Sequence, residues 1–208
     1  MVKTVRAVCL SVAEILVRQD HRAQHEAEWE AVKGLPPGAV RHALWGGPWW
    51  QEYITGRRTV DSYHRAVAEA LHMRYPDEVM RFIELFYAGE QIDDALLALV
   101  ARLRPRYRVG LVTDAGPEQQ IQLLHKFGLD TRVAFDDHLI SGVVGVAKPS
   151  PILFQLACER LGVAPDEAVM VDTAAANIEA ARSIGMQGVL YAGLPALLEA
   201  LQALGVNM

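Results

Sequence analysis

The sequence contains little of what marks secreted, membrane or nucleic-acid-binding proteins. Two of its 208 residues are cysteine, Cys9 and Cys158, so two buried thiols in a reducing cytoplasm are expected rather than a disulfide framework. No apolar run approaches the roughly 20 residues that span a bilayer. The 20 basic and 25 acidic side chains give a net charge of -5 without any block of like charges. We therefore expect a cytoplasmic protein that binds neither membranes nor nucleic acids.

The N-terminal segment shares some features with a secretory signal. Lys3 and Arg6 precede an apolar stretch over residues 7–17. However, Ser11 and Glu14 interrupt that stretch, and no cleavage site of small residues follows it. A buried first strand is the interpretation that these residues favour.

The overall amino-acid composition is typical of a globular protein. Hydrophobic residues make up 51% and charged residues 22%, and the length fits one domain with a modest insertion. Residues 18–92 show helical periodicity and no β-branched run, which predicts an all-helical insert between core segments 1–17 and 93–208. Helices are predicted within the insert over residues 21–33, 38–44, 49–54, 59–71 and 76–87.

Strands and helices alternate in the second half. Predicted helices cover residues 93–103, 117–127, 151–161, 177–184 and 195–204, and predicted strands cover 107–113, 133–135, 168–171 and 188–191. This alternation predicts an α/β fold, with a Rossmann-like three-layer core around a parallel sheet. Ligands bind such sheets at the carboxyl ends of the strands.

Polar residues occur at several of those predicted strand ends. Val112-Thr113-Asp114 closes one strand, Gly145-Val146-Ala147-Lys148-Pro149 follows another, and Val171-Asp172-Thr173 precedes a helix that contains Asn177. In order and spacing these segments resemble the second, third and fourth motifs of the haloacid dehalogenase superfamily of phosphatases and dehalogenases. The resemblance extends over the whole chain and points to the branch with a helical C1-type cap after the first motif.

The resemblance implies a role for each matching residue. An aspartate at the end of the first strand forms a covalent ester with the substrate in this family. Thr113 would donate a hydrogen bond to the transferred group, and Lys148 would neutralise the nucleophile and the phosphoryl oxygens. Asp172 would help to hold Mg²⁺. Thr113, Asp114 and Lys148 would together bind a small anionic or phosphorylated ligand.

The first motif departs from the family. Ser11 occupies the nucleophile position, Ala13 the position of the second acid, and Glu14 the usual place of a turn glycine. Asp172 is then the one firm carboxylate, so Mg²⁺ binding is expected to be weak or absent. We expect a catalytically impaired pseudoenzyme that retains at most a phosphate- or anion-binding site.

Other interpretations remain open at this stage. A phosphatase or hydrolase could act on a small phosphorylated or halogenated metabolite through a variant first motif, with water activated near Asp172 or Glu14. Ser11 could be a nucleophile with Lys148 as its base, although no Gly-x-Ser-x-Gly elbow surrounds it. Ser11 and Ala13 could also have been introduced deliberately, to trap a ligand or to inactivate an enzyme. Deliberate inactivation ordinarily changes one residue, whereas Glu14 and Ile15 also depart from the family pattern.

Two groups in the insert have both a functional and a structural interpretation. His21 and His25 have the spacing of metal ligands on a helix, yet no third ligand is evident and a solvated face is more typical. Trp45, Trp49 and Trp50 could line a ligand pocket, form the insert's core or mediate a homodimer.

Overall fold

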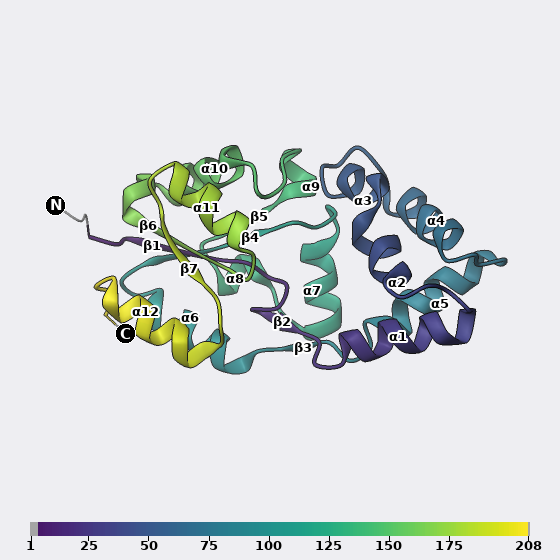
Figure 1. Cartoon of the computed structure of the whole chain (residues 1–208). Helices are drawn as coiled ribbons and strands as arrows, with labels where there is room; N and C mark the ends of the chain where they lie inside the picture. Colours follow the sequence, from purple (N-terminus) through teal and green to yellow (C-terminus); the bar gives the residue numbers. More distant parts are fainter. Residues whose placement is uncertain (1–3, 208) are drawn as a thin grey trace.

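The computed structural model describes residues 4–207, so Lys3 of the signal-like segment lies outside the described part. Its centre is a parallel five-stranded sheet in the order β5-β4-β1-β6-β7, drawn on the left of Figure 1. This sheet confirms the predicted α/β class. Its strands are β1 (Ala7–Leu10), β4 (Arg108–Thr113), β5 (Asp137–Ile140), β6 (Ala168–Asp172) and β7 (Gln187–Leu190).

Helices cover both faces of the sheet because its central strand is apolar on both sides. Val8 and Leu10 of β1 contribute to one buried cluster and Ala7 and Cys9 to another, as the alternation of side chains along a strand requires. The first cluster takes residues from α6 (Asp94–Leu103), α7 (Gln119–Phe127) and α12 (Leu194–Ala203). The second takes them from α10 (Pro151–Leu161) and α11 (Ala175–Ser183), on the opposite face (Figure 1).

The predicted helical insert has a hydrophobic cluster of its own. Phe82 and Phe86 are buried at its centre, and Trp45, Trp49 and Trp50 pack partly buried against it. This packing favours the structural interpretation of the three tryptophans. The insert's elements are α1 (Arg22–Lys33), α2 (Ala39–Arg41), the π-helical turn η1 (His42–Gly46), α3 (Pro48–Tyr53), α4 (Val60–Ala70) and α5 (Pro76–Phe86).

Two short strands that the sequence did not predict connect the insert to the sheet. β2 (Val17–Arg18) enters the insert and β3 (Gln91–Ile92) leaves it, and the two pair antiparallel. Separate hydrophobic clusters on either side of this pair support a proposed division into a cap domain, residues 18–92, and a core domain, residues 1–17 and 93–208.

The strand predicted over residues 133–135 is wrong. The structure has the short helix α8 (Thr131–Ala134) there, and the Asp130 side chain caps it by accepting a hydrogen bond from the Arg132 N–H. The edge strand β5 follows at Asp137–Ile140, where polar Asp137 and His138 are tolerated because one side of the strand is unpaired. The short helices α9 (Ser141–Val144) and η2 (Pro165–Glu167) complete the fold.

None of the helices within residues 4–207 is long and apolar enough to cross a membrane.

Candidate functional site

Three of the predicted site residues lie at the carboxyl ends of adjacent strands. Ser11 directly follows β1, Thr113 ends β4 and Asp172 ends β6, and all three are buried. The Ser11 N–H donates to the carbonyl oxygen of Val171 at 3.0 Å, which continues the β1–β6 ladder by one residue. The sheet therefore brings together the positions that the motifs predicted.

Lys148 joins this group from the loop that follows α9. Its ammonium donates to Asp172 Oδ2 at 2.7 Å and to Ser11 Oγ at 2.9 Å. The Lys148 and Asp172 side chains are only 6% and 3% exposed. The other carboxylate oxygen of Asp172, Oδ1, accepts the Ala174 N–H at 2.9 Å. Both charges of this buried ion pair are thus satisfied within the protein, which such a pair requires in order to persist.

This geometry bears on whether Ser11 could be a nucleophile. A serine hydroxyl needs a neighbouring base that accepts its proton. Lys148 instead donates to Ser11 Oγ, and a carboxylate 2.7 Å away stabilises the charged ammonium form. The arrangement therefore disfavours Lys148 as the base for Ser11.

Asp114 adds a second carboxylate to the site. Its Oδ1 accepts the backbone N–H of Lys148 at 2.9 Å, so the second motif fastens the loop that carries the lysine. Burial raises the pKa of the Asp114 carboxyl, the nearby Lys148 lowers it less strongly, and Asp172 raises it further. One lysine therefore faces two carboxyl groups, which weakens the site's attraction for an anion.

The turn after Ser11 contributes no carboxylate to this group. Ala13 is exposed and apolar. Glu14 adopts a left-handed backbone with φ 63°, and its carboxylate pairs with Arg22 at the start of α1. A left-handed conformation costs a non-glycine residue about 1–2 kcal/mol, and a partly exposed ion pair returns up to about 1 kcal/mol. Glu14 is thus directed at the insert and does not replace the acid missing at Ala13.

The residues around Asp172 do not suit a resident Mg²⁺ ion. Both carboxylate oxygens of Asp172 already have partners within the protein. Thr173, the next residue along the chain, is exposed and uncharged. Over residues 4–207 no group of three or more His, Cys, Asp or Glu side chains is arranged so that it could hold a metal ion. Mg²⁺ is normally held by one or two carboxylates together with a substrate phosphate, and Asp172 could bind the ion only in competition with its present hydrogen bonds.

The insert packs directly on the loops that carry the site. The Tyr53 ring lies against Gly116, where any Cβ atom would overlap it, and the Tyr53 hydroxyl donates to Glu118 at 3.1 Å. Ala147, next to Lys148, packs against the insert's hydrophobic cluster. The insert therefore contacts the loops that follow Thr113 and precede Lys148.

A partly buried polar network beside the edge strand was not predicted. His138 contacts the Thr131 hydroxyl at 3.0 Å and the Gln119 side-chain oxygen at 3.2 Å. Burial lowers the pKa of His138 to about 4, with a smaller effect from Arg160. His138 and Thr131 line a hollow of about 370 Å³ whose walls do not include Ser11. This network could not be predicted from the sequence, because its residues come from α7, α8 and β5 and meet only in the folded structure.

Comparisons with known proteins agree with this architecture. The model of the haloacid dehalogenase-like hydrolase family matches residues 5–185. Phosphoserine phosphatase of Thermus thermophilus is 33% identical over 173 residues, which are 79% of this chain and 62% of that protein. Glyceraldehyde 3-phosphate phosphatase of Pyrococcus furiosus is 31% identical over 102 residues, 49% of this chain and 42% of that protein. The chain thus spans less than two thirds of the length of these two relatives.

A solved structure shares the fold along most of the chain. An enzyme of this family from Bacteroides thetaiotaomicron has a TM-score of 0.73 and 16% identity, covering 91% of this chain and 96% of that one. It was solved with magnesium and inorganic phosphate, both as the wild-type protein and as a variant in which an aspartate is replaced by alanine.

Proposed function

This chain belongs to the haloacid dehalogenase-like hydrolases, and we propose that it binds a small phosphate- or carboxylate-bearing metabolite without forming the family's covalent intermediate. The observation that carries the proposal is the position of Lys148 between Ser11 and Asp172. The lysine contacts a hydroxyl at the nucleophile position, and this hydroxyl has no base beside it.

The proposed ligand contacts follow from the donors at the strand ends. The Lys148 ammonium and the Thr113 hydroxyl are two side-chain donors at this edge of the sheet. A bound anion would compete with Asp172 for Lys148, so its affinity should be modest. The enzyme from Bacteroides thetaiotaomicron supports phosphate binding without the aspartate, because its variant with one aspartate replaced by alanine was still solved with phosphate.

Magnesium has a minor part in this proposal. Mg²⁺ would neutralise a phosphate ligand, and Asp172 is the carboxylate best placed to hold the ion. Because both Asp172 oxygens are already bonded, the ion would bind weakly and chiefly through the ligand's own oxygens.

The relatives favour a second candidate function, and they favour it over a loss of activity. Two of them are phosphatases by name, so this chain could hydrolyse a small phosphorylated metabolite through its variant first motif. A water molecule would then be the nucleophile, and Asp172 would have to exchange Lys148 for that water.

One assay separates the two candidates. Hydrolysis of an aryl phosphate with Mg²⁺ is measured for the unmodified chain, Ser11→Ala, Ser11→Asp and Ser11→Asp/Ala13→Asp, with Thr113→Val prepared in parallel to control for contaminating phosphatase. Activity confined to the variants with restored aspartates supports the proposed function. Activity in the unmodified chain that survives Ser11→Ala but not Thr113→Val overturns it and supports the second candidate.

A further inference from the structure

Arg22 of the insert is held in a site built from several side chains. Its Nε donates to Gln19 Oε1 at 2.9 Å, its guanidinium lies 5.2 Å from the centre of the Trp45 ring, and its Nη1 pairs with Glu14. Gln19 is itself buried, and its amide nitrogen donates to the carbonyl oxygen of Phe86. The orientation of this guanidinium is therefore fixed by groups other than the carboxylate that it binds.

Glu14 is fixed less firmly than its partner. Its side chain is 45% exposed, whereas that of Arg22 is 22% exposed. It adopts a left-handed backbone that is unfavourable for any residue with a Cβ atom. Because this strain and the gain from a partly exposed ion pair are of similar size and opposite sign, stability alone does not account for a glutamate here.

We propose that Arg22 is an anion-binding residue of the insert, and that the Glu14 carboxylate occupies its site until a carboxylate or phosphate group of a ligand displaces it. A guanidinium recognises both groups through the same fork of donors. Arg22 keeps one ion pair in this exchange, because the ligand replaces the Glu14 carboxylate, and the Glu14 side chain rotates outward into the solvent. Glu14 lies three residues after Ser11, so the exchange takes place beside the turn that follows the nucleophile position. The ligand class rests on the proposed function.

The test measures binding of inorganic phosphate and, separately, of acetate by isothermal titration calorimetry in Mg²⁺-free buffer. Glu14→Gln removes the competing charge and should strengthen binding about two- to fivefold, the most that a partly exposed ion pair accounts for. Glu14→Gln/Arg22→Met should abolish that gain, and Arg22→Met alone should show none. The probe that responds more strongly identifies the anionic group that Arg22 prefers.

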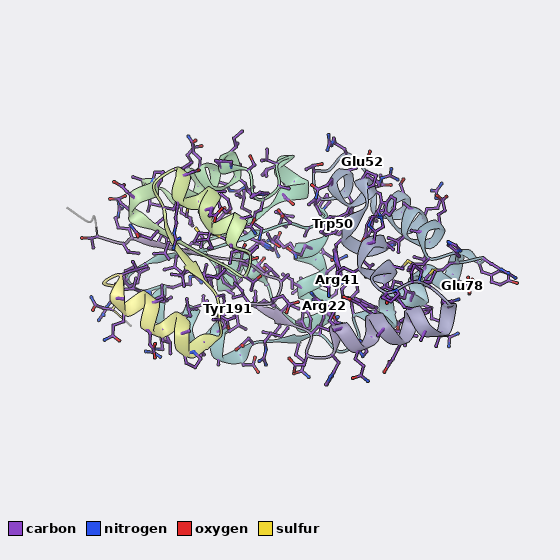
Figure 2. The ribbon with its side chains drawn as sticks, in the orientation of Figure 1. Arg22, Arg41, Trp50, Glu52, Glu78 and Tyr191 are labelled. Carbon is purple, nitrogen blue, oxygen red and sulfur yellow. The ribbon has the colours of Figure 1, made fainter. Side chains whose placement is uncertain are left out.

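A matched control lies elsewhere in the insert. Arg58 and Glu52 form an ion pair whose side chains are 28% and 42% exposed, close to the values for Arg22 and Glu14. Figure 2 shows Glu52 at the upper edge of the insert and Arg22 at its lower edge. Glu52→Gln removes the same charge from the protein and should leave both affinities unchanged.

The outcomes separate this inference from the proposed function. Equal gains in Glu14→Gln and Glu52→Gln would show a general charge effect and overturn the role of Arg22. A gain that persists in Glu14→Gln/Arg22→Met would also overturn it, and so would the absence of anion binding in every variant. Anion binding that appears only in Glu14→Gln, and vanishes in Glu14→Gln/Arg22→Met, supports Arg22 even if the unmodified chain binds no anion and the proposed function fails.

Discussion

The two halves of the strand-end site differ in what they offer to Lys148. One half, which we call the retained half, consists of Thr113, Asp114, Lys148 and Asp172, and the Lys148 and Asp172 side chains in it are buried and bonded to each other. The turn over residues 11–15 offers no carboxylate to that lysine, since Ala13 is apolar and Glu14 binds Arg22. Motifs that match a family in position therefore leave the interactions of their side chains open, because the lysine and the aspartate of two motifs here bind each other.

The largest expected effect comes from breaking the buried ion pair. Lys148→Met keeps the length of the side chain and leaves Asp172 buried without a counter-charge, so the free energy of unfolding at pH 7 should fall by about 3–5 kcal/mol. Urea denaturation measures the change. Lys148→Met/Asp172→Asn should recover most of the loss, since neither charge then remains. A loss under about 1 kcal/mol in the single variant would mean that the two side chains are not paired in solution.

The loss of folding stability in acid should come from His138, which lies outside both halves of the strand-end site. The pKa of His138 is about 4 in the folded protein, against 6.5 for an unperturbed histidine. Between these pH values the unfolded chain binds a proton that the folded chain does not. Stability is therefore lost as pH falls from about 6.5 to 4, by roughly 2–3 kcal/mol.

His138→Gln should flatten this pH dependence in urea titrations, and Lys148→Met/Asp172→Asn should preserve it. A pH profile that disappears only when the ion pair is removed would assign the acid sensitivity to the retained half of the site instead.

A smaller effect is expected at Asp114, within the retained half. Its raised pKa means that the ionised carboxylate is unfavourable in the folded protein at pH 7. Asp114→Asn keeps an oxygen for the Lys148 N–H and removes that charge, so stability at pH 7 should rise and phosphate should bind more tightly. Asp136→Asn is the control, because Asp136 also accepts a backbone N–H, from Val109, but lies beside the start of β4, at the end of the strand opposite to Thr113 and Asp114. A loss of stability in Asp114→Asn would contradict this electrostatic account.

The smallest expected effect is at Glu14, where two substitutions separate the cost of the left-handed backbone from the loss of the carboxylate charge. Glu14→Gly and Glu14→Ala both remove the ion pair, but only glycine relieves the left-handed backbone. Glycine should therefore be the more stable of the two by about 1 kcal/mol in thermal or urea denaturation. Equal stabilities would show that residue 14 leaves the left-handed region once its carboxylate is gone.

Much of the fold could be predicted because local patterns agree with the tertiary structure. The alternation of strands and helices, the insert, and the helix end at Gly34, which has a positive φ, are all in the structure. The strand predicted over residues 133–135 was wrong because its apolar residues suggested β structure, whereas the Asp130 cap starts a helix there. A short polar edge strand such as β5 carries little hydrophobic pattern to detect.

The positions of the site could be predicted, but its interactions could not. The motifs placed Ser11, Thr113, Lys148 and Asp172 at one edge of the sheet. The pairing of Lys148 with Asp172, 24 residues later, and the direction of the Glu14 carboxylate depend on loop geometry that no periodicity encodes. Arg22 was missed for the same reason.

The central claim is that this site binds an anion without covalent chemistry at residue 11. Intact-mass spectrometry after rapid acid quenching of the protein with an aryl phosphate and Mg²⁺ tests it most directly, with Ser11→Asp/Ala13→Asp as the reference for a working nucleophile. The account predicts that the unmodified chain gains no phosphoryl group. A phosphoryl adduct that maps to the peptide containing Ser11 would contradict it.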